Sequence, residues 1–358
     1  IRIEPPGGHP MRSLGPFVHD EPDPEKSLYW FQFNTSKRGI TLNLDCADGR
    51  EIFKRLVKTA DVVVETFPPG QLDRMGLGYS VLKGINPRLI LTSITPFGQT
   101  GPYRDFKGSD LVAQAMGGLM NLAGFPEDPP YRIHGSQAYH SASVEAALGT
   151  MIALYVRELT GEGQQVDVSL QESVPMAMET AMQHYDLRKE VRRRVARPPV
   201  VPGIGLYECK DGHVFAYVVA GFGAGWDVIV DWLDSEGKAG DLKDEKWGEV
   251  FELMMNFRAL IALVTDPPRL MARLGQFGHI NGIFTDFLAA KTKQEIYEEA
   301  AQRRIMIVPA QTAKDLVDSP QLQALGYFVD VDHPELGMSL KYPGAPYYYI
   351  AETPWRIS

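Results

Sequence analysis

The strongest constraint on the fold is a succession of short apolar strands and amphipathic helices in the first half of the chain. Residues 40–44, 61–65 and 89–94 are typical of strands, and β-branched side chains dominate the second of them. Between the first two, residues 49–59 repeat apolar side chains at the spacing of a helix that faces a core. Strands and helices that alternate in this way predict an α/β fold with a parallel sheet and crossover helices.

The same pattern continues to about residue 185. Residues 141–159 predict a long helix, and residues 165–170 alternate like a strand. A further helix is expected over 174–185. Small side chains allow close approach of neighbours, so the long helix should be central; they are Ala142, Ala146, Ala147, Gly149 and Ala153.

The second half of the chain has a different character. Residues 191–202 are basic and proline-rich, which is typical of a linker. Beyond them, apolar segments flank Lys210, Asp211 and Gly212, a strong hairpin signal. A length of 358 residues favours two domains. We therefore expect a large α/β domain and a smaller α+β domain; the boundaries are 1–190, 191–202 (linker), 203–310 and 311–358, the last rejoining the first domain.

Composition excludes several classes of protein. The net charge of −9 disfavours non-specific binding to nucleic acid or anionic lipid. Only Cys46 and Cys209 occur, which excludes a disulfide framework or a cysteine-rich zinc site and fits a reducing cytosol. No apolar run reaches 18 residues. We expect a cytoplasmic protein with no metal and no nucleic-acid or membrane partner.

Familiar catalytic signatures are missing, so the site must be sought in loops. The sequence has no G-x-x-x-x-G-K-[ST], H-E-x-x-H or G-x-S-x-G. A G-x-G-x-G segment at 221–225 follows the hairpin and does not open a βαβ unit, which argues against a dinucleotide site. Ligands in open α/β sheets bind outside the carboxyl ends of the strands. The corresponding loops are 66–70, 95–103 and 171–173, unless these segments merely connect strands to helices.

Ten short motifs, read in order along the chain, carry a family resemblance. They occupy residues 3–8, 34–42, 66–70, 72–76, 98–103, 110–115, 161–164, 166–172, 333–337 and 352–355. Together they resemble the family III CoA-transferases, the CaiB/BaiF family, which includes formyl-CoA transferase and α-methylacyl-CoA racemase. The similarity covers nearly the whole chain.

The resemblance implies a Rossmann-like large domain, a smaller domain and two chains interlocked like links. It implies an acyl-CoA and a small carboxylic acid as substrates, with coenzyme A bound by the large domain. A homodimer is expected, and a hetero-oligomer with a paralogue is the alternative. It also implies a preceding segment that would supply the first strand and backbone amides of the site.

The resemblance places the catalytic nucleophile at Glu172, where the family usually has aspartate. A carboxylate at this point attacks the thioester, forms a mixed anhydride and is then captured by CoA as an enzyme thioester. Glutamate carries one more methylene and reaches about 1.5 Å further, a shift that matters at preorganised sites. The alternative is that Glu172 is only a charge at a helix N-terminus.

The racemase branch of the family has histidine where this chain has Ser109. Serine with an ordinary pKa cannot remove a proton α to a thioester carbonyl, which argues against a racemase or isomerase. His134 and His140 are the nearby substitutes in sequence, although a single histidine is more often structural.

Contacts with CoA carry over from the family by position. The residues are Leu42, Asn43, Leu44, Asp45, Thr66, Phe67, Pro68, Arg74, Lys107, Gly108 and Ser109. Arg74 matches a phosphate-binding arginine, and the alternative is a solvated helix residue. Pro68 has no amide hydrogen to donate, and Asp45 stands where a lysine can occur. Both departures weaken phosphate contact.

The loop of Gly221, Gly223 and Gly225 matches a glycine-rich loop that closes over the reactive carboxylate in formyl-CoA transferase. Trp226 behind it either walls the acyl pocket or anchors the small domain. Two functions remain ahead of an isomerase: an acyl-CoA:carboxylate CoA-transferase, or a non-catalytic subunit beside an aspartate-bearing paralogue. The acyl group is not readable from the sequence.

Overall fold

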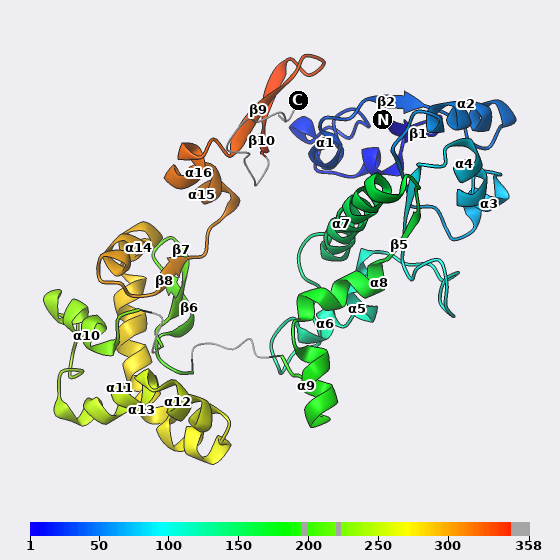
Figure 1. Ribbon diagram of the computed structural model, residues 1–358. Coiled ribbons are helices and arrows are strands. Elements are labelled where there is room, and N and C mark those ends of the chain that lie inside the picture. The colour runs from blue at the N-terminus through cyan, green and yellow to red at the C-terminus, as the bar shows by residue number, and fades with distance from the viewer. Residues whose placement is uncertain (195–199, 220–222, 345–358) are drawn as a thin grey trace. The chain divides into compact units, whose positions relative to one another are not determined.

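The computed structural model describes residues 1–194, 200–219 and 223–344, and the chain forms two compact units (Figure 1). The first unit contains residues 1–196 and 329–358, and the second contains 197–328. The segment expected to return to the first domain, 311–358, is thus divided, with 311–328 in the second unit. In the described part of the chain, every helix is too short or too polar to cross a bilayer.

A three-stranded parallel sheet forms the centre of the first unit. Its strands are β3 (Val62–Glu65), β4 (Ile90–Thr95) and β5 (Gln165–Ser169), in the order β3-β4-β5. The predicted α/β class and parallel sheet are therefore confirmed. The expected strand at 40–44 is shorter, and its place in this sheet was wrong: β2 (Gly39–Thr41) pairs in parallel with β1 (Arg2–Glu4) in a sheet of two strands.

The helices of the first unit are mostly short. They are η1 (Pro10–Ser13), η2 (Val18–Asp20), α1 (Leu28–Asn34), α2 (Ala47–Val57), α3 (Gln71–Arg74), α4 (Tyr79–Ile85), α5 (Asp110–Met116), α6 (Leu119–Leu122), α7 (Gln137–Thr160), α8 (Leu170–Ser173), η3 (Val174–Met178) and α9 (Ala181–Arg188). A hairpin of β9 (Phe328–His333) and β10 (Met338–Pro343) follows the second unit. The helix expected over 174–185 was wrong as a continuous element, because Glu179 has a φ of 51° and a ψ of −114° and breaks it into η3 and α9.

The sheet of the first unit has two different faces. One face is apolar: Ile94, Val166 and Val168 pack against the buried alanines of α7, Ala138 and Ala142 among them. This confirms the close approach expected from the small residues of that helix. On the opposite face, Val63 and Leu91 belong to a second apolar cluster with Leu72, Leu77 and Leu82. Nearer the carboxyl ends this second face becomes polar.

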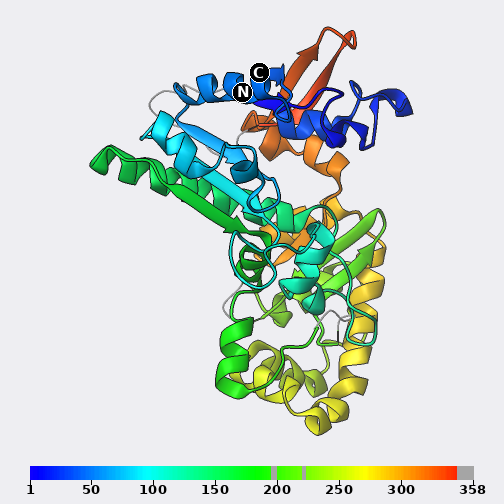
Figure 2. The same cartoon turned by 90° about the vertical axis from the view of Figure 1, so that its right-hand side faces the viewer.

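The second unit combines a small antiparallel sheet with a set of helices. Strands β6 (Ile204–Cys209), β7 (Gly212–Tyr217) and β8 (Ile307–Pro309) are adjacent in that order, which confirms the hairpin. The helices are α10 (Trp226–Ser235), η4 (Glu245–Trp247), α11 (Gly248–Met255), α12 (Phe257–Val264), α13 (Pro267–Ala289), α14 (Lys293–Gln302), α15 (Ala313–Val317) and α16 (Pro320–Ala324). Helix α13, in yellow, runs beside the β6–β7 hairpin in both views (Figure 1 and Figure 2).

Candidate functional site

A row of polar side chains crosses the sheet of the first unit near its carboxyl end. The register places Glu65 opposite Ser93 and Ser93 opposite Asp167, so all three share one face. Each carboxylate accepts a hydrogen bond from the start of a loop. Oε2 of Glu65 accepts from the Phe67 amide at 2.7 Å, and Oδ2 of Asp167 accepts from the Gln99 amide at 2.9 Å. The row therefore fixes the loops that follow β3 and β4.

Burial dominates the electrostatics of Glu65 within this row. Desolvation raises the pKa of Glu65, and the nearby charges of Asp167 and Asp73 raise it further. Hydrogen bonds from Ser93 and from the Phe67 amide oppose this shift without reversing it. Glu65 therefore binds a proton more readily than an exposed glutamate does.

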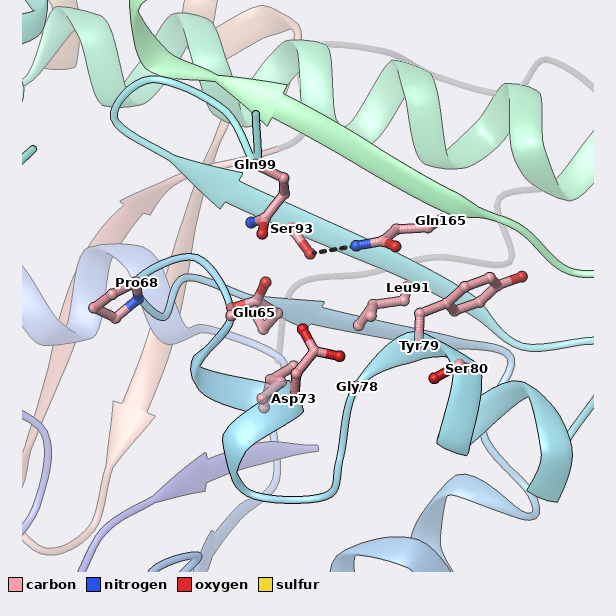
Figure 3. A pocket seen from close by; sticks show the side chains of 12 residues that line it. Glu65, Pro68, Asp73, Gly78, Tyr79, Ser80, Leu91, Ser93, Gln99 and Gln165 are labelled. Atoms are coloured by element: carbon pink, nitrogen blue, oxygen red, sulfur yellow. Dashed lines mark hydrogen bonds between the residues drawn. The ribbon is translucent and has the colours of Figure 1, made fainter. Parts of the chain in front are cut away.

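A pocket of about 280 Å³ lies against the same face. Figure 3 shows Glu65 and Asp73 side by side in it, with Ser93 and Gln165 above, joined at 3.5 Å. Pro68 lies on the loop at its edge. Because carboxylates line the pocket, it disfavours an anionic group and suits neutral polar atoms.

Glu172 lies immediately beyond β5, in the short helix α8. The Ser169 hydroxyl caps the N-terminus of this helix by accepting a hydrogen bond from the Glu172 amide at 3.3 Å. The Ser173 hydroxyl donates to the Ser169 carbonyl at 2.8 Å. The Glu172 side chain is exposed, and the described residues give its carboxylate no hydrogen-bond or ion-pair partner. A carboxylate whose backbone is held in place and whose oxygens are exposed is available for nucleophilic attack.

Helix α8 and the stretch 107–109 meet at Pro96. The Gln171 amide donates to the Pro96 carbonyl at 3.1 Å. A Cβ on Gly108 would lie only 2.4 Å from Cβ of Pro96, so only glycine permits this approach. Lys107 and Ser109 are exposed, and the Ser109 hydroxyl caps α5 by accepting from the Val112 amide at 3.4 Å. The structure thus brings the expected stretch 107–109 to the loop that holds the Glu172 helix.

The other expected CoA contacts gather around a different apolar cluster. Leu42, Leu44 and Phe67 belong to one cluster, which joins the segments 42–45 and 66–68. Asn43 and Asp45 are exposed, and Oδ1 of Asn43 accepts from the Asp45 amide at 2.9 Å.

The remaining expected contacts in this region face outward. Thr66, Pro68 and Arg74 are exposed on the loop after β3 and on α3. Their side chains are therefore available to a ligand on the surface of the first unit.

The glycine loop lies in the second unit. Gly221 falls outside the described residues. The backbone of Gly223, with a φ of 141°, approaches so closely that a Cβ would lie 2.4 Å from the Arg304 carbonyl oxygen. Gly225 precedes α10 as its N-cap. Trp226 is completely buried in the aromatic core, so of its two possible roles the structure supports the anchor of the small unit.

Sequence reasoning missed four residues that shape this region. Glu65 and Asp167 are charged residues on the same face of adjacent strands, Glu65 half-buried and Asp167 exposed, and the segments V-V-V-E and Q-V-D-V-S contain both charges. Arg50 donates to the carbonyls of Leu44 and Asp45 at 3.1 and 2.8 Å and so holds the segment 42–45 in place. Arg104 approaches the loop after β3 from another loop, and no local pattern indicates it.

The described side chains offer no group of three or more His, Cys, Asp or Glu residues placed to hold a metal ion.

Comparisons with known proteins define the class. The model of CoA-transferase family III matches residues 1–358, and the chain belongs to this family. The predicted family is thereby confirmed. A crystal structure of a CAIB/BAIF family protein from Brucella suis has a TM-score of 0.81 at 26% identity and covers 99% of this chain and 87% of its own.

Two curated relatives of this chain are named as CoA-transferases. Succinyl-CoA:(R)-benzylsuccinate CoA-transferase subunit BbsE of Thauera aromatica is 33% identical over 100% of this chain and 83% of its own length. Formyl-CoA:oxalate CoA-transferase of Streptomyces avermitilis is 32% identical over 94% and 79%. The predicted enzyme class, a CoA-transferase acting on CoA thioesters, is thus confirmed.

Proposed function

We propose that this protein moves CoA from a donor acyl-CoA to an acceptor carboxylic acid through a covalent intermediate on Glu172. One observation carries the proposal: an exposed carboxylate, to which the described residues give no partner, stands directly after β5, on a helix fixed by Ser169 and by the Pro96 loop. The exposed loops at 66–68 and 107–109 follow or adjoin the strands of the same unit. This is where open α/β sheets bind ligands.

The chemistry runs through four acyl exchanges. A Glu172 oxygen attacks the donor thioester carbon, and CoA leaves as a thiolate. The thiolate attacks the Glu172 carbonyl, releasing the donor acid and leaving CoA as a thioester on Glu172. The acceptor carboxylate attacks this thioester and expels the thiolate again. The thiolate then attacks the acceptor acyl carbon, which yields the new acyl-CoA and regenerates the Glu172 carboxylate.

CoA binding is proposed for the first unit, with residues 1–190 as its main part. The segments 42–45 and 66–68 share one apolar cluster, and Arg74 is exposed beside them. Residues 107–109 reach the loop that holds α8. This distribution suits a long ligand with a nucleotide end and a thioester end. Gly223 and Gly225, in the second unit, are retained as part of the substrate loop that the family resemblance implies.

Trapping the intermediate tests the proposal. The chain is incubated with succinyl-CoA, formyl-CoA or an aryl-substituted acyl-CoA, then treated with hydroxylamine or borohydride, and the peptide containing Glu172 is weighed by mass spectrometry. A hydroxamate or an alcohol on Glu172 is expected. Glu172→Gln should lose about 10⁴-fold or more in turnover while CoA still binds, because an amide is a very poor nucleophile. Glu127→Gln, an exposed acid of the same unit, is the matched control.

Full turnover in Glu172→Gln would refute the nucleophile. Glu172→Asp adds information about geometry, because it shortens the reach of the carboxylate by one methylene. Activity equal to or above that of the wild type indicates a site built for aspartate. Lower activity indicates a backbone adapted to glutamate.

A second function is favoured by a specific observation. Glutamate replaces the aspartate usual at position 172, and one relative is named as a subunit of its enzyme. We propose as the alternative that this chain is the non-catalytic partner of an aspartate-bearing paralogue. Turnover that appears only when such a paralogue is added, with no adduct on Glu172, would select this alternative.

An assembly of two chains, interlocked as in the family, is proposed from the exposed face of α7. Five large apolar side chains at helical spacing are each more than half exposed: Val144, Leu148, Met151, Tyr155 and Leu159. A contiguous apolar stripe of this kind marks an interface. The partner is a second copy of the chain in the first proposal and the paralogue in the alternative.

A further inference from the structure

We propose that Arg104 is a second phosphate-binding residue for CoA, acting with Arg74 across Gly70. The assignment rests on the proposed function of the first unit. It adds a residue that the sequence motifs did not single out, from a different loop. The ligand it would hold is a phosphate group of the CoA nucleotide.

Two arginines converge on one point of the backbone. Arg74 belongs to α3, and Arg104 belongs to the loop that follows β4. A Cβ built on Gly70 would lie 3.4 Å from Nη1 of Arg74 and 3.7 Å from Nη2 of Arg104. Because both distances start at the same point, the two nitrogens are within about 7 Å of each other. Gly70, with a φ of 72°, leaves this point free of a side chain.

The described residues leave the two positive charges largely unneutralised. They place no carboxylate within 4 Å of the Arg74 guanidinium. For Arg104 they place only Asp105, its neighbour in sequence, at 3.4 Å from Nε. That Nε atom is buried and donates no hydrogen bond to any described group. Two like charges held close together without an anion between them favour binding of an anion.

Phosphate fits this arrangement better than other anions do. A guanidinium presents a planar fork of N–H donors that matches phosphate oxygens, and two of them suit a group with more than one charge. Pro68 on the same loop has no amide hydrogen, so the loop needs a donor from elsewhere. Gly70 also lines the pocket that holds Glu65 and Asp73, whose carboxylates repel phosphate. The phosphate is therefore expected on the side of Gly70 that the two arginines approach, away from these carboxylates.

Binding measurements on the full chain test the assignment. Isothermal titration calorimetry with CoA, dephospho-CoA and pantetheine compares wild type with Arg104→Ala, Arg104→Lys and Arg74→Ala. Arg55→Ala, an exposed arginine of α2 in the same unit, is the matched control. Arg104→Ala should weaken CoA binding about tenfold, the range for a charged hydrogen bond. Pantetheine binding should not change, and Arg104→Lys should recover part of the loss.

The ligand series separates the two sources of phosphate. A loss shared by CoA and dephospho-CoA places the diphosphate at Arg104, and a loss for CoA alone places the 3′-phosphate there; either result supports the assignment. Unchanged CoA affinity in Arg104→Ala, with wild-type binding intact, would overturn this assignment alone. A wild-type chain without affinity for CoA would overturn the proposed function and this assignment with it. Equal losses for all three ligands would indicate a folding defect and contradict a phosphate contact.

Discussion

The two units of this chain are stabilised in different ways. The second unit has one continuous core, in which large aromatic side chains such as Trp226, Trp232, Phe277 and Phe284 are almost completely buried. The first unit has two smaller apolar clusters on opposite faces of its sheet. Polar groups occupy the carboxyl end of one of those faces, at Glu65, Ser93 and Asp167.

This difference follows from what the site requires. A buried polar group is costly unless it is hydrogen-bonded, and the half-buried Glu65 accepts a hydrogen bond from the Phe67 amide. The exposed Asp167 accepts one from the Gln99 amide at the same end of the sheet. The same loops carry the proposed contacts with CoA. The second unit carries no comparable polar row among its described strands, and its interior is packed with apolar side chains. We therefore expect the stability of the second unit to depend mainly on the packing of its core. For the first unit, we expect changes of charge and of the association between chains to matter more.

The largest effect on stability is expected from the core of the second unit. Trp226 stacks on Phe251 with ring centres 5.6 Å apart and meets the edge of Phe284 at 5.4 Å. Trp226→Ala should destabilise the unit by about 3–5 kcal/mol, because it removes a large buried side chain and leaves a cavity. Hydrogen exchange measured by mass spectrometry should rise in peptides of the second unit. Trp226→Phe should cost less, and a rise confined to the first unit would contradict the comparison.

The next largest effect is expected on the association of two chains, which we propose to occur through the first unit. Leu148→Glu with Tyr155→Glu places two charges on the exposed stripe of α7. Because both side chains are exposed, the fold of a single chain should change by less than about 0.5 kcal/mol. Association should weaken by about 2 kcal/mol or more, since charges would be buried without partners. Sedimentation velocity should show a smaller species.

Val81→Glu provides the control for the assembly variant. Val81 is an exposed apolar residue on α4, away from the stripe in sequence, and its charge should leave sedimentation unchanged. The same mass for the wild type and the stripe variant would show that α7 does not mediate association. A wild-type chain that is monomeric at micromolar concentration would count against the assembly itself.

The sequence predicted the regular part of the first unit better than its pairings. Residues 61–65, 89–94 and 165–170 alternate or are β-branched, and all three became strands of the sheet. The partner of residues 40–44 was not predictable from their own pattern, because pairing with Arg2–Glu4 is a long-range contact. Residues 174–185 have helical spacing, but the left-handed backbone of Glu179 breaks the helix, and glutamate gives no local signal for that conformation.

The residues of the candidate site also differ in how far the sequence could predict them. Glu172 was predicted as the nucleophile through the family resemblance, at a position that follows a recognisable strand. The convergence of Arg74 and Arg104 at Gly70 depends on tertiary structure that joins two loops. The charged positions of β3 and β5 were visible in the sequence, but whether Glu65 and Asp167 faced solvent or a loop depended on which face α7 covers.

In the first unit, a carboxyl group should make stability more dependent on pH where it is buried than where it is exposed. Because burial raises the pKa of Glu65 in the fold, that group adds stability below its unfolded value of 4.5 and loses this contribution as pH rises through the folded value. Glu65→Gln stays neutral and keeps an acceptor for the Phe67 amide. The melting temperature of the variant relative to wild type should therefore increase from pH 4.5 upward. A difference that stays constant with pH would contradict a buried, titrating Glu65; Glu51→Gln, exposed on α2, is the control.

The smallest effect is expected from an ion pair in the second unit, where packing should dominate. Lys293 pairs with Asp315, and with the Thr312 cap it lowers the pKa of Asp315 to about 2. This lowered value adds stability above the unfolded pKa of 3.8 and loses it as pH falls toward 2. Asp315→Asn keeps an acceptor for Thr312 but lacks the charge, so its melting temperature should lie below wild type at pH 6 and converge with it near pH 2. Asp318→Asn, which breaks the exposed pair with Lys314 on the same helix, should change little at any pH. A loss for Asp315→Asn as large as that for Trp226→Ala would show that charge matters as much as packing in this unit and would remove the contrast between the two.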